Sequence, residues 1–289
     1  MLQVPFIREH QELVINRLSK RNLDATEMID EVIKLDEERR QTQSELDNTL
    51  AESNSLYKSG NTDQANALKK RTTQLKDDSK ALTEKLNTVS EKLDELLYKI
   101  PNVPNDLVPA GNSEDDNEEV YREGDIPELP KNALPHWELA IKYGIIDFEL
   151  GNKITGAGFP VYKGKGAKLQ RALINYFLDK NTTAGYSEVQ VPHLVNEASG
   201  FGTGQLPDKE GQMYHVTEDN LYLIPTAEVP ATNLFRGDLL AENELPKAIT
   251  GYTPCFRREA GSYGAHVRGL NRLHQFDKVE ILRIEHPDR

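Results

Sequence analysis

The sequence predicts an α+β protein in which a long pair of antiparallel helices precedes a domain built on antiparallel β-sheet. Two heptad-repeat stretches occupy most of residues 24–99. A proline-rich, acidic stretch follows them. Further on, the segment Cys255–Glu280 alternates at both ends around a glycine-containing centre, which is typical of a β-hairpin. We therefore expect three parts: a helical arm (1–100), a linker (101–134) and a sheet domain (135–289).

The helical arm is predicted by two seams, each a series of positions spaced in alternating steps of four and three residues. The first seam comprises Met28, Val32, Leu35, Arg39, Thr42, Leu46, Thr49, Ser53 and Leu56. The second comprises Leu68, Thr72, Leu75, Ser79, Leu82, Leu86, Val89, Leu93 and Leu96. Ser59-Gly60-Asn61 separates them, and so short a break makes the two helices fold back antiparallel. Threonine and serine dilute both seams, so we expect marginal packing.

Charge is unevenly distributed along the arm and along the chain. The net charge of the chain is −12, whereas Cys255–Glu280 has five basic and three acidic residues, hence +2. The second arm helix carries a basic cluster in which Lys69, Lys76 and Lys80 share one face. Such a face is commonly only solvated, but it also suits the backbone phosphates of an RNA.

Composition restricts the class of protein. Cys255 is the single cysteine, which excludes a disulfide framework and a cysteine-rich zinc site and fits a reducing cytoplasm. No apolar run approaches the roughly 18 residues that a membrane span needs, and the N-terminus lacks a signal pattern. We expect a cytoplasmic protein that does not contact a membrane.

A helix and a strand are predicted before the hairpin. Lys168–Lys180 places its apolar residues on one side of a helix, and Gly185 follows as a C-terminal glycine would. The residues from Tyr186 to Pro192 then alternate and end at proline, which favours an edge strand.

The hairpin carries the most specific pattern in the chain. Phe256-Arg257-Arg258-Glu259 resembles the F-R-x-E signature of class II aminoacyl-tRNA synthetases, and the continuation AGSYGAHVRGLNRLHQFDKVE resembles the bacterial seryl-tRNA synthetases. Two further stretches are similar to that family: IPNVPNDLVPAGNSEDDNEEV in the linker, and a Thr-x-Glu loop at Thr226–Glu228. The resemblance implies a class II antiparallel-sheet catalytic domain behind a tRNA-binding coiled-coil arm.

The resemblance also implies roles for individual residues. Arg257 would clamp the α-phosphate of ATP and meet the carboxylate of serine, and Glu259 would orient ATP; these two are the expected catalytic residues. Phe276 would stack on adenine, and Arg258, Arg268 and Arg272 would contact phosphates or the end of the tRNA. The serine pocket would comprise Thr226, Ala227, Glu228, Arg257 and Glu280, with the Glu280 carboxylate holding the ammonium group.

The implied activity is that of a serine–tRNA ligase. It would use ATP with Mg²⁺ to activate L-serine and would then load serine tRNA, and in this family also selenocysteine tRNA. We expect no protein-bound metal ion in the amino-acid pocket, because zinc-dependent variants need cysteine ligands. Lys69, Lys76 and Lys80 would grip the tRNA. The helix–strand unit, with Gly185 and Pro192 at matching positions, would form the interface of a homodimer.

One departure from the family pattern is that the sequence stops at Arg289, before a third class II motif. We therefore expect a fragment of a longer enzyme that is not competent alone. Two alternatives remain open: a coiled-coil RNA-binding or interaction protein with a degenerate synthetase domain, and a synthetase-like ligase that loads a carrier protein. The intact hairpin and Thr-x-Glu residues argue against the first, and the long arm argues against the second.

Overall fold

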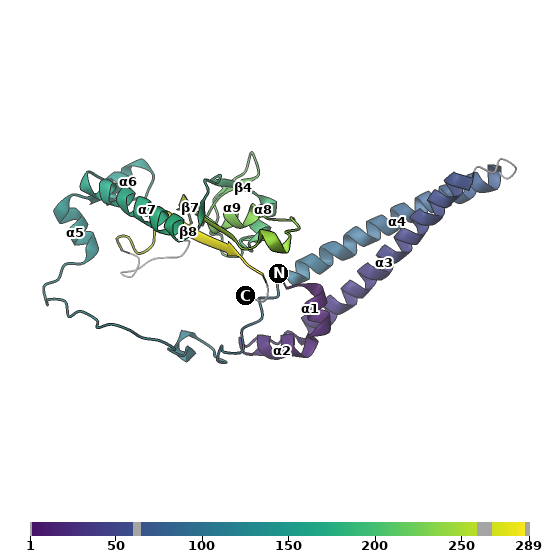
Figure 1. Ribbon diagram of the computed structural model, residues 1–289, viewed down its shortest axis with the longest axis horizontal. Coiled ribbons are helices and arrows are strands. Elements are labelled where there is room, and N and C mark those ends of the chain that lie inside the picture. The colour runs from purple at the N-terminus through teal and green to yellow at the C-terminus, as the bar shows by residue number, and fades with distance from the viewer. Residues whose placement is uncertain (1, 60–64, 259–267, 287–289) are drawn as a thin grey trace. The chain divides into compact units, whose positions relative to one another are not determined.

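The computed structural model describes residues 2–59, 65–258 and 268–286 and divides into two compact units, Met1–Asp125 and Ile126–Arg289. The first unit contains the helices α1 (Val4–Glu9), α2 (Gln11–Ser19), α3 (Thr26–Ser59) and α4 (Ala65–Leu97) and a short 3-10 turn at Glu114–Asp116 (Figure 1). No described helix combines the length and apolar character that crossing a bilayer requires.

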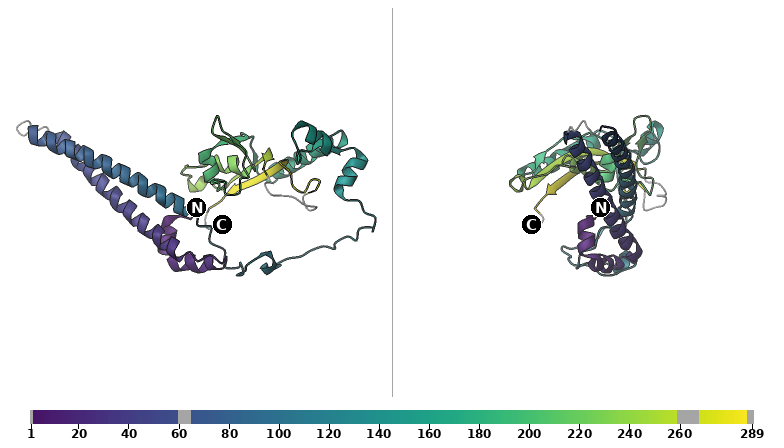
Figure 2. Two further views of the ribbon diagram at one scale, coloured as in Figure 1. Left: turned by 180° about the vertical axis from the view of Figure 1, so that it is seen from behind. Right: turned by 90° about the vertical axis from the view of Figure 1, so that its right-hand side faces the viewer.

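The two long helices of the first unit run antiparallel, as the short break between the seams predicts. Arg71 of α4 pairs with Glu52 of α3 at 2.6 Å, and Lys85, further along α4, pairs with Glu38, further back along α3, at 3.2 Å. The views in Figures 1 and 2 agree that α3 and α4 lie side by side. At both seams, every position whose side chain is described is buried or half-buried, and the side chain of Leu68 lies outside the described part. The predicted coiled-coil pairing is therefore confirmed.

The main apolar core of this unit lies where the two N-terminal helices join the long pair. Ile7 of α1 and Val14 of α2 are fully buried and pack with buried residues of α3 and α4. The buried members are Ile7, Val14, Leu18, Ala25, Ile29, Val32, Leu35, Val89, Leu93, Leu97 and Ile100. Farther along α3 the buried position 42 is a threonine. Apolar burial is thus densest at one end of the arm, while Leu46 and Leu75 are buried farther along it.

A buried carboxylate joins α1 to α3. The side chain of Asp36 is only 2% exposed, and it accepts hydrogen bonds from Arg8 of α1 at 2.9 Å and from Arg39 at 2.9 Å and Arg40 at 3.0 Å within α3. Burial acts to raise the pKa of Asp36, but the hydrogen bonds and charges of the three arginines outweigh it, so the pKa is lowered.

Part of the predicted linker packs against the first unit. The Lys20 ammonium donates to the carbonyl oxygens of Asp106 and Val108, at 3.0 Å each, and the Asn22 amide donates to the carbonyl oxygen of Gly111 at 2.8 Å. These contacts were not predicted from composition, because a proline-rich segment gives no local signal for its tertiary partners.

The described part of the second unit contains three small sheets with helices around them. Its elements are α5 (His136–Tyr143), β1 (Ile146–Asp147), α6 (Phe148–Ile154), β2 (Val161–Tyr162), α7 (Lys165–Thr183), β3 (Ser187–Glu188), β4 (Leu194–Asn196), α8 (Glu197–Gly202), β5 (His215–Val216), β6 (Leu221–Leu223), α9 (Glu228–Asn233), a 3-10 turn (Glu242–Glu244), β7 (Lys247–Phe256) and β8 (Gln275–Ile284). The sheet orders are β1-β2, β3-β7-β8 and β4-β6-β5. Pairing is antiparallel throughout, except that β3 runs parallel to β7.

The predicted hairpin is confirmed and is longer than its motif. β7 and β8 pair antiparallel over ten residues each, with Cys255 opposite Phe276 and Gly251 opposite Glu280. The glycine-containing centre of the predicted hairpin, residues 260–269, lies mostly outside the described residues. The edge strand expected over 186–192 is reduced to β3, two residues on the outer side of β7.

Helix α7 ends as its sequence predicts. Gly185 adopts a left-handed φ of +94°, and its N–H donates to the carbonyl of Thr182 at 3.0 Å, which closes the end of the helix. α7 lies against β7 and β8, because Gln170 hydrogen-bonds Asp277 and Asn181 donates to the Thr250 hydroxyl at 2.9 Å. Its predicted apolar side nevertheless remains largely exposed: Leu169, Leu173, Tyr176 and Phe177 keep 57%, 46%, 55% and 48% of their surface.

Candidate active site

The pleat of the hairpin sorts its residues into two faces. In β8, Phe276, Lys278 and Glu280 are two residues apart and therefore point to the same side. The intervening Asp277 points to the other side, where it accepts a hydrogen bond from the Tyr252 hydroxyl at 2.6 Å and contacts α7. The face opposite α7 thus carries an aromatic ring, an ammonium and a carboxylate in a row.

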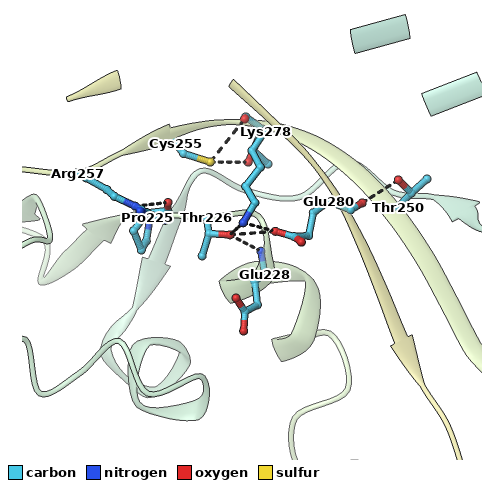
Figure 3. A network of polar contacts seen from close by, with 9 residues as sticks. Pro225, Thr226, Glu228, Thr250, Cys255, Arg257, Lys278 and Glu280 are labelled. Carbon is cyan, nitrogen blue, oxygen red and sulfur yellow. Dashed lines mark hydrogen bonds and ion pairs between the residues drawn. The ribbon is translucent and has the colours of Figure 1, made fainter. Parts of the chain in front are cut away.

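A polar cluster forms where this face meets the turn after β6 (Figure 3). The Thr226 hydroxyl donates to Oε2 of Glu280 at 3.0 Å and accepts from Nζ of Lys278 at 2.9 Å. Nζ of Lys278 also pairs with the same Oε2 at 2.7 Å. Thr226 is 3% exposed, so its hydroxyl is held inside the fold with its hydrogen bonds made.

The carboxylate of Glu280 keeps one oxygen available. Among the residues that the structure describes, both donors reach Oε2 and none reaches Oε1. The side chain of Glu280 is 22% exposed, so a ligand can approach it from solvent. A carboxylate accepts several hydrogen bonds at once, and Oε1 is therefore free to receive an ammonium group.

Lys278 was not predicted from the sequence to be a site residue. Its spacing could have found it, because Phe276 and Glu280 were both assigned to the site and a residue midway between them shares their face. Its side-chain contact with both Thr226 and Glu280 makes it the third member of the cluster.

The other predicted serine-pocket residues behave differently. Glu228 is the first residue of α9 and is exposed, and its carboxylate points away from Thr226, Lys278 and Glu280 (Figure 3). It contributes to the cluster through its backbone N–H, which donates to the Thr226 hydroxyl at 3.3 Å. Ala227, which is 1% exposed, lies in the turn between them. The structure therefore brings Thr226 and Glu280 together but leaves the Glu228 side chain outside their contact.

Arg257 connects the polar cluster to a neighbouring cavity. Its Nε donates to the carbonyl oxygen of Pro225, the residue before Thr226, at 3.3 Å, and its guanidinium lies 5.2 Å from the centre of the Phe276 ring. A cavity of about 290 Å³ opens beside this pair. Its lining residues are Arg257, Leu270, Asn271, Arg272, Leu273 and Phe276. Two guanidinium groups and an aromatic ring at one cavity suit a phosphorylated ligand with a flat base.

The remaining predicted ATP contacts are spread over a wider area. Arg258 is exposed, and its backbone N–H donates to the carbonyl of Gln212 at 2.8 Å. The Arg268 guanidinium lies over the Trp137 ring, 5.3 Å from its centre, and lines a second cavity of about 340 Å³ rather than the first. Arg272 lines both cavities. Glu259 lies outside the described residues.

Cys255 lies on the site face but is chemically quiet. It is fully buried, and burial raises the pKa of its thiol despite the hydrogen bond with Thr253 and the nearby Lys278 charge. A thiol with a raised pKa is a poor nucleophile. Among the described residues, no group of three or more His, Cys, Asp or Glu side chains could together hold a metal ion.

The predicted tRNA contacts lie on the first unit. Lys69, Lys76 and Lys80 are exposed along α4, and Lys80 approaches Glu84 at 4.0 Å. Two other basic residues of α4, Arg71 and Lys85, instead form ion pairs that tie α4 to α3.

A stretch of each unit matches a known protein family. Residues 214–289 match the family described as the tRNA synthetase class II core domain of the G, H, P, S and T types. Residues 1–104, which contain the arm, match the family described as the seryl-tRNA synthetase N-terminal domain.

Individual relatives narrow the class to one family. The serine–tRNA ligases of Salinibacter ruber and Mesoplasma florum are each 43% identical to the chain, over 100% and 98% of it, and over 69% and 68% of their own lengths. The crystal structure of Pyrococcus horikoshii seryl-tRNA synthetase complexed with ATP superposes with a TM-score of 0.81 at 29% identity, covering 97% of this chain and 69% of that one. The cytoplasmic serine–tRNA ligase of Naegleria fowleri, in complex with AMP, superposes with a TM-score of 0.79 at 27% identity, over 100% and 68%. The chain belongs to the seryl-tRNA synthetase family.

Proposed function

We propose that this chain carries the amino-acid-activating site and the tRNA-gripping arm of a serine–tRNA ligase. The observation that carries the proposal is the adjacency of two half-sites on one face of the hairpin. The polar cluster of Thr226, Lys278 and Glu280 offers a carboxylate oxygen for an ammonium. Through Arg257 it adjoins a cavity fit for nucleotide phosphates and base. An amino acid and ATP bound there would have their reacting groups side by side.

The chemistry follows from this arrangement. The carboxylate oxygen of serine attacks the α-phosphorus of ATP, the bond to pyrophosphate breaks, and seryl-adenylate forms. A terminal hydroxyl of the tRNA then attacks the acyl carbon, and AMP leaves. Arg257 holds the negative charge that develops at the α-phosphate, while Glu280 holds the ammonium. No step needs a covalent protein nucleophile, in keeping with the protonated thiol of Cys255.

Several finer assignments belong to the same proposal. Phe276 would stack on the adenine, and Arg258, Glu259, Arg268 and Arg272 would assist in holding ATP. Mg²⁺ would enter with the phosphates of ATP, because the described residues give it no ready ligand cluster. We expect the protein to act in the cytoplasm, where Cys255 stays reduced.

The proposed function also includes contacts with tRNA and with a second copy of the chain. Lys69, Lys76 and Lys80 would track the tRNA backbone, which protein side chains recognise by phosphate and shape. The exposed apolar side of α7, with Gly185 in the turn that follows it and Pro192 beyond β3, would meet its copy in a homodimer.

The test is an ATP–pyrophosphate exchange assay on the natural protein. We expect exchange to depend on L-serine and to be at least a hundredfold slower with L-alanine, because a pocket that pairs a hydroxyl strongly rejects the analogue that lacks it. Absence of any serine-dependent exchange by a folded, ATP-binding protein would overturn the proposal.

A further inference from the structure

The start of α5 contacts residues 268–270, which lead into the cavity of about 290 Å³ beside Arg257 and Phe276, here called the nucleotide cavity. His136, the first residue of α5, accepts the backbone N–H of Leu270 on its Nε2 at 2.8 Å. The next residue, Trp137, supplies the ring over which the Arg268 guanidinium lies at 5.3 Å. Two consecutive residues of one helix thus contact the residues on both sides of Gly269. The helix and this segment are more than 130 positions apart in sequence.

The close approach requires glycine at position 269. Gly269 has a φ of +77°, and a Cβ atom built there would lie 2.2 Å from Nε2 of His136. A side chain there would have to displace the imidazole from its present position, and few residues adopt that φ. The segment 268–270 is therefore shaped to receive the imidazole.

Position 270 is also where the wall of the nucleotide cavity begins. Leu270, Asn271, Arg272 and Leu273 line the cavity together with Arg257 and Phe276. Fixing the backbone of Leu270 restricts where the side chain two residues later, Arg272, can lie. A guanidinium binds phosphate well only when it is held in place, so whatever anchors residue 270 contributes to phosphate binding.

We propose that His136 and Trp137 are positioning residues for ATP: they hold segment 268–270 and thereby set Arg272 at the nucleotide cavity, while Arg268 lines the neighbouring cavity that Arg272 also lines. Neither residue has to touch ATP. The inference rests on the proposed function in so far as ATP is the ligand. It adds α5, which lies outside the segment matched by the class II core family, to the parts that determine nucleotide affinity.

The first test measures ATP affinity by equilibrium dialysis of labelled ATP with the full chain. His136→Leu removes the acceptor, and we expect the Kd for ATP to rise about tenfold because the Leu270 N–H loses its partner. His136→Gln restores an acceptor oxygen at similar reach and should return the Kd to within about twofold of the original. The Kd for serine should stay within about twofold in both variants, because Thr226 and Glu280 lie outside segment 268–270. Tyr143→Leu, at the exposed end of the same helix, is the matched control and should leave both Kd values unchanged.

The second test follows the contact itself through fluorescence. Trp137 is the single tryptophan of the chain, so its emission reports on the Arg268 guanidinium over its ring. We expect Arg268→Met to change the emission spectrum and Arg268→Lys to restore much of it, in the absence of any nucleotide.

The outcomes separate the two ideas. A wild-type chain that binds no ATP contradicts the proposed function and, with it, the role of His136 and Trp137 toward ATP. A wild-type chain that binds ATP while His136→Leu binds it equally well contradicts this inference alone. Equal weakening of ATP and serine binding, or no rescue by glutamine, would show that His136 only stabilises the fold, and would also overturn it.

Discussion

Single residues of the polar cluster explain how one carboxylate can serve both the fold and a ligand. Oε2 of Glu280 is occupied by Thr226 and Lys278, which fix the direction of the side chain, whereas Oε1 stays open. Removing the charge of Glu280 therefore affects the ligand more than the fold, because Thr226 and Lys278 can still bond to an amide oxygen.

The variant Glu280→Gln should weaken serine binding by about 2–5 kcal/mol and leave ATP binding nearly unchanged, since a buried charge pair loses one partner. Isothermal titration of serine and of ATP measures both. Glu285→Gln, just beyond the same strand, is the control and should bind serine like the parent. An unchanged serine affinity in Glu280→Gln would contradict the assignment of the ammonium site.

Among the elements, α1 is held to the arm by the buried carboxylate of Asp36. Because the pKa of Asp36 is lower in the folded chain than its usual 3.8, the folded state binds this proton more weakly than the unfolded state. The stabilisation is therefore fully present above about pH 4 and is lost as the pH falls through the lowered pKa.

The variant Asp36→Asn should lose about 2 kcal/mol of unfolding free energy at neutral pH, the typical value of hydrogen bonds to a charged group. Urea unfolding of the first unit, followed by circular dichroism from pH 7 to pH 2.5, measures this. Below pH 4 the parent should approach the variant. A constant difference between the two at all pH values would show that the carboxylate's charge is not what stabilises the contact.

Helix α7 should mediate self-association if its exposed apolar side meets a second copy. Tyr176→Glu places a charge on that side at a position that is 55% exposed, so the protomer should fold while the dimer dissociates at micromolar concentration. Arg171→Glu, on the other side of α7, is the control and should remain dimeric. Sedimentation velocity measures both, and a parent protein that is monomeric throughout the micromolar range would refute the interface.

For the whole molecule, we expect the arm to be needed for tRNA loading but not for amino-acid activation. Residues 42–82 can be replaced by a short glycine-rich turn without touching the core cluster, whose outermost arm members are Leu35 and Val89, and the Glu38–Lys85 pair is kept. ATP–pyrophosphate exchange should stay within about twofold, because every residue proposed to contact ATP or serine follows position 225, and His136 and Trp137 also lie outside the replaced stretch. Aminoacylation of serine tRNA should fall about a hundredfold or more, as expected when a substrate is no longer held in register.

A second variant changes only the charge of the arm and keeps its length. Replacing Lys69, Lys76 and Lys80 by glutamine keeps the helices but should reduce the salt dependence of tRNA binding, since fewer phosphates are neutralised. Survival of both activities in the truncated protein would show that the arm has another role, such as holding a protein partner.

Local sequence determined the helical arm, the hairpin, the glycine end of α7 and the family, because these depend on periodicity, short-range backbone preferences and contiguous motifs. It also determined that Thr226 and Glu280 belong together, by resemblance. Only the tertiary structure decided that Glu228 points away, that Lys278 joins the cluster, that Asp36 is buried among arginines, and that α5 reaches Leu270. The reason is physical: which side chains meet is set by packing between segments far apart in the chain, and no local pattern encodes that choice.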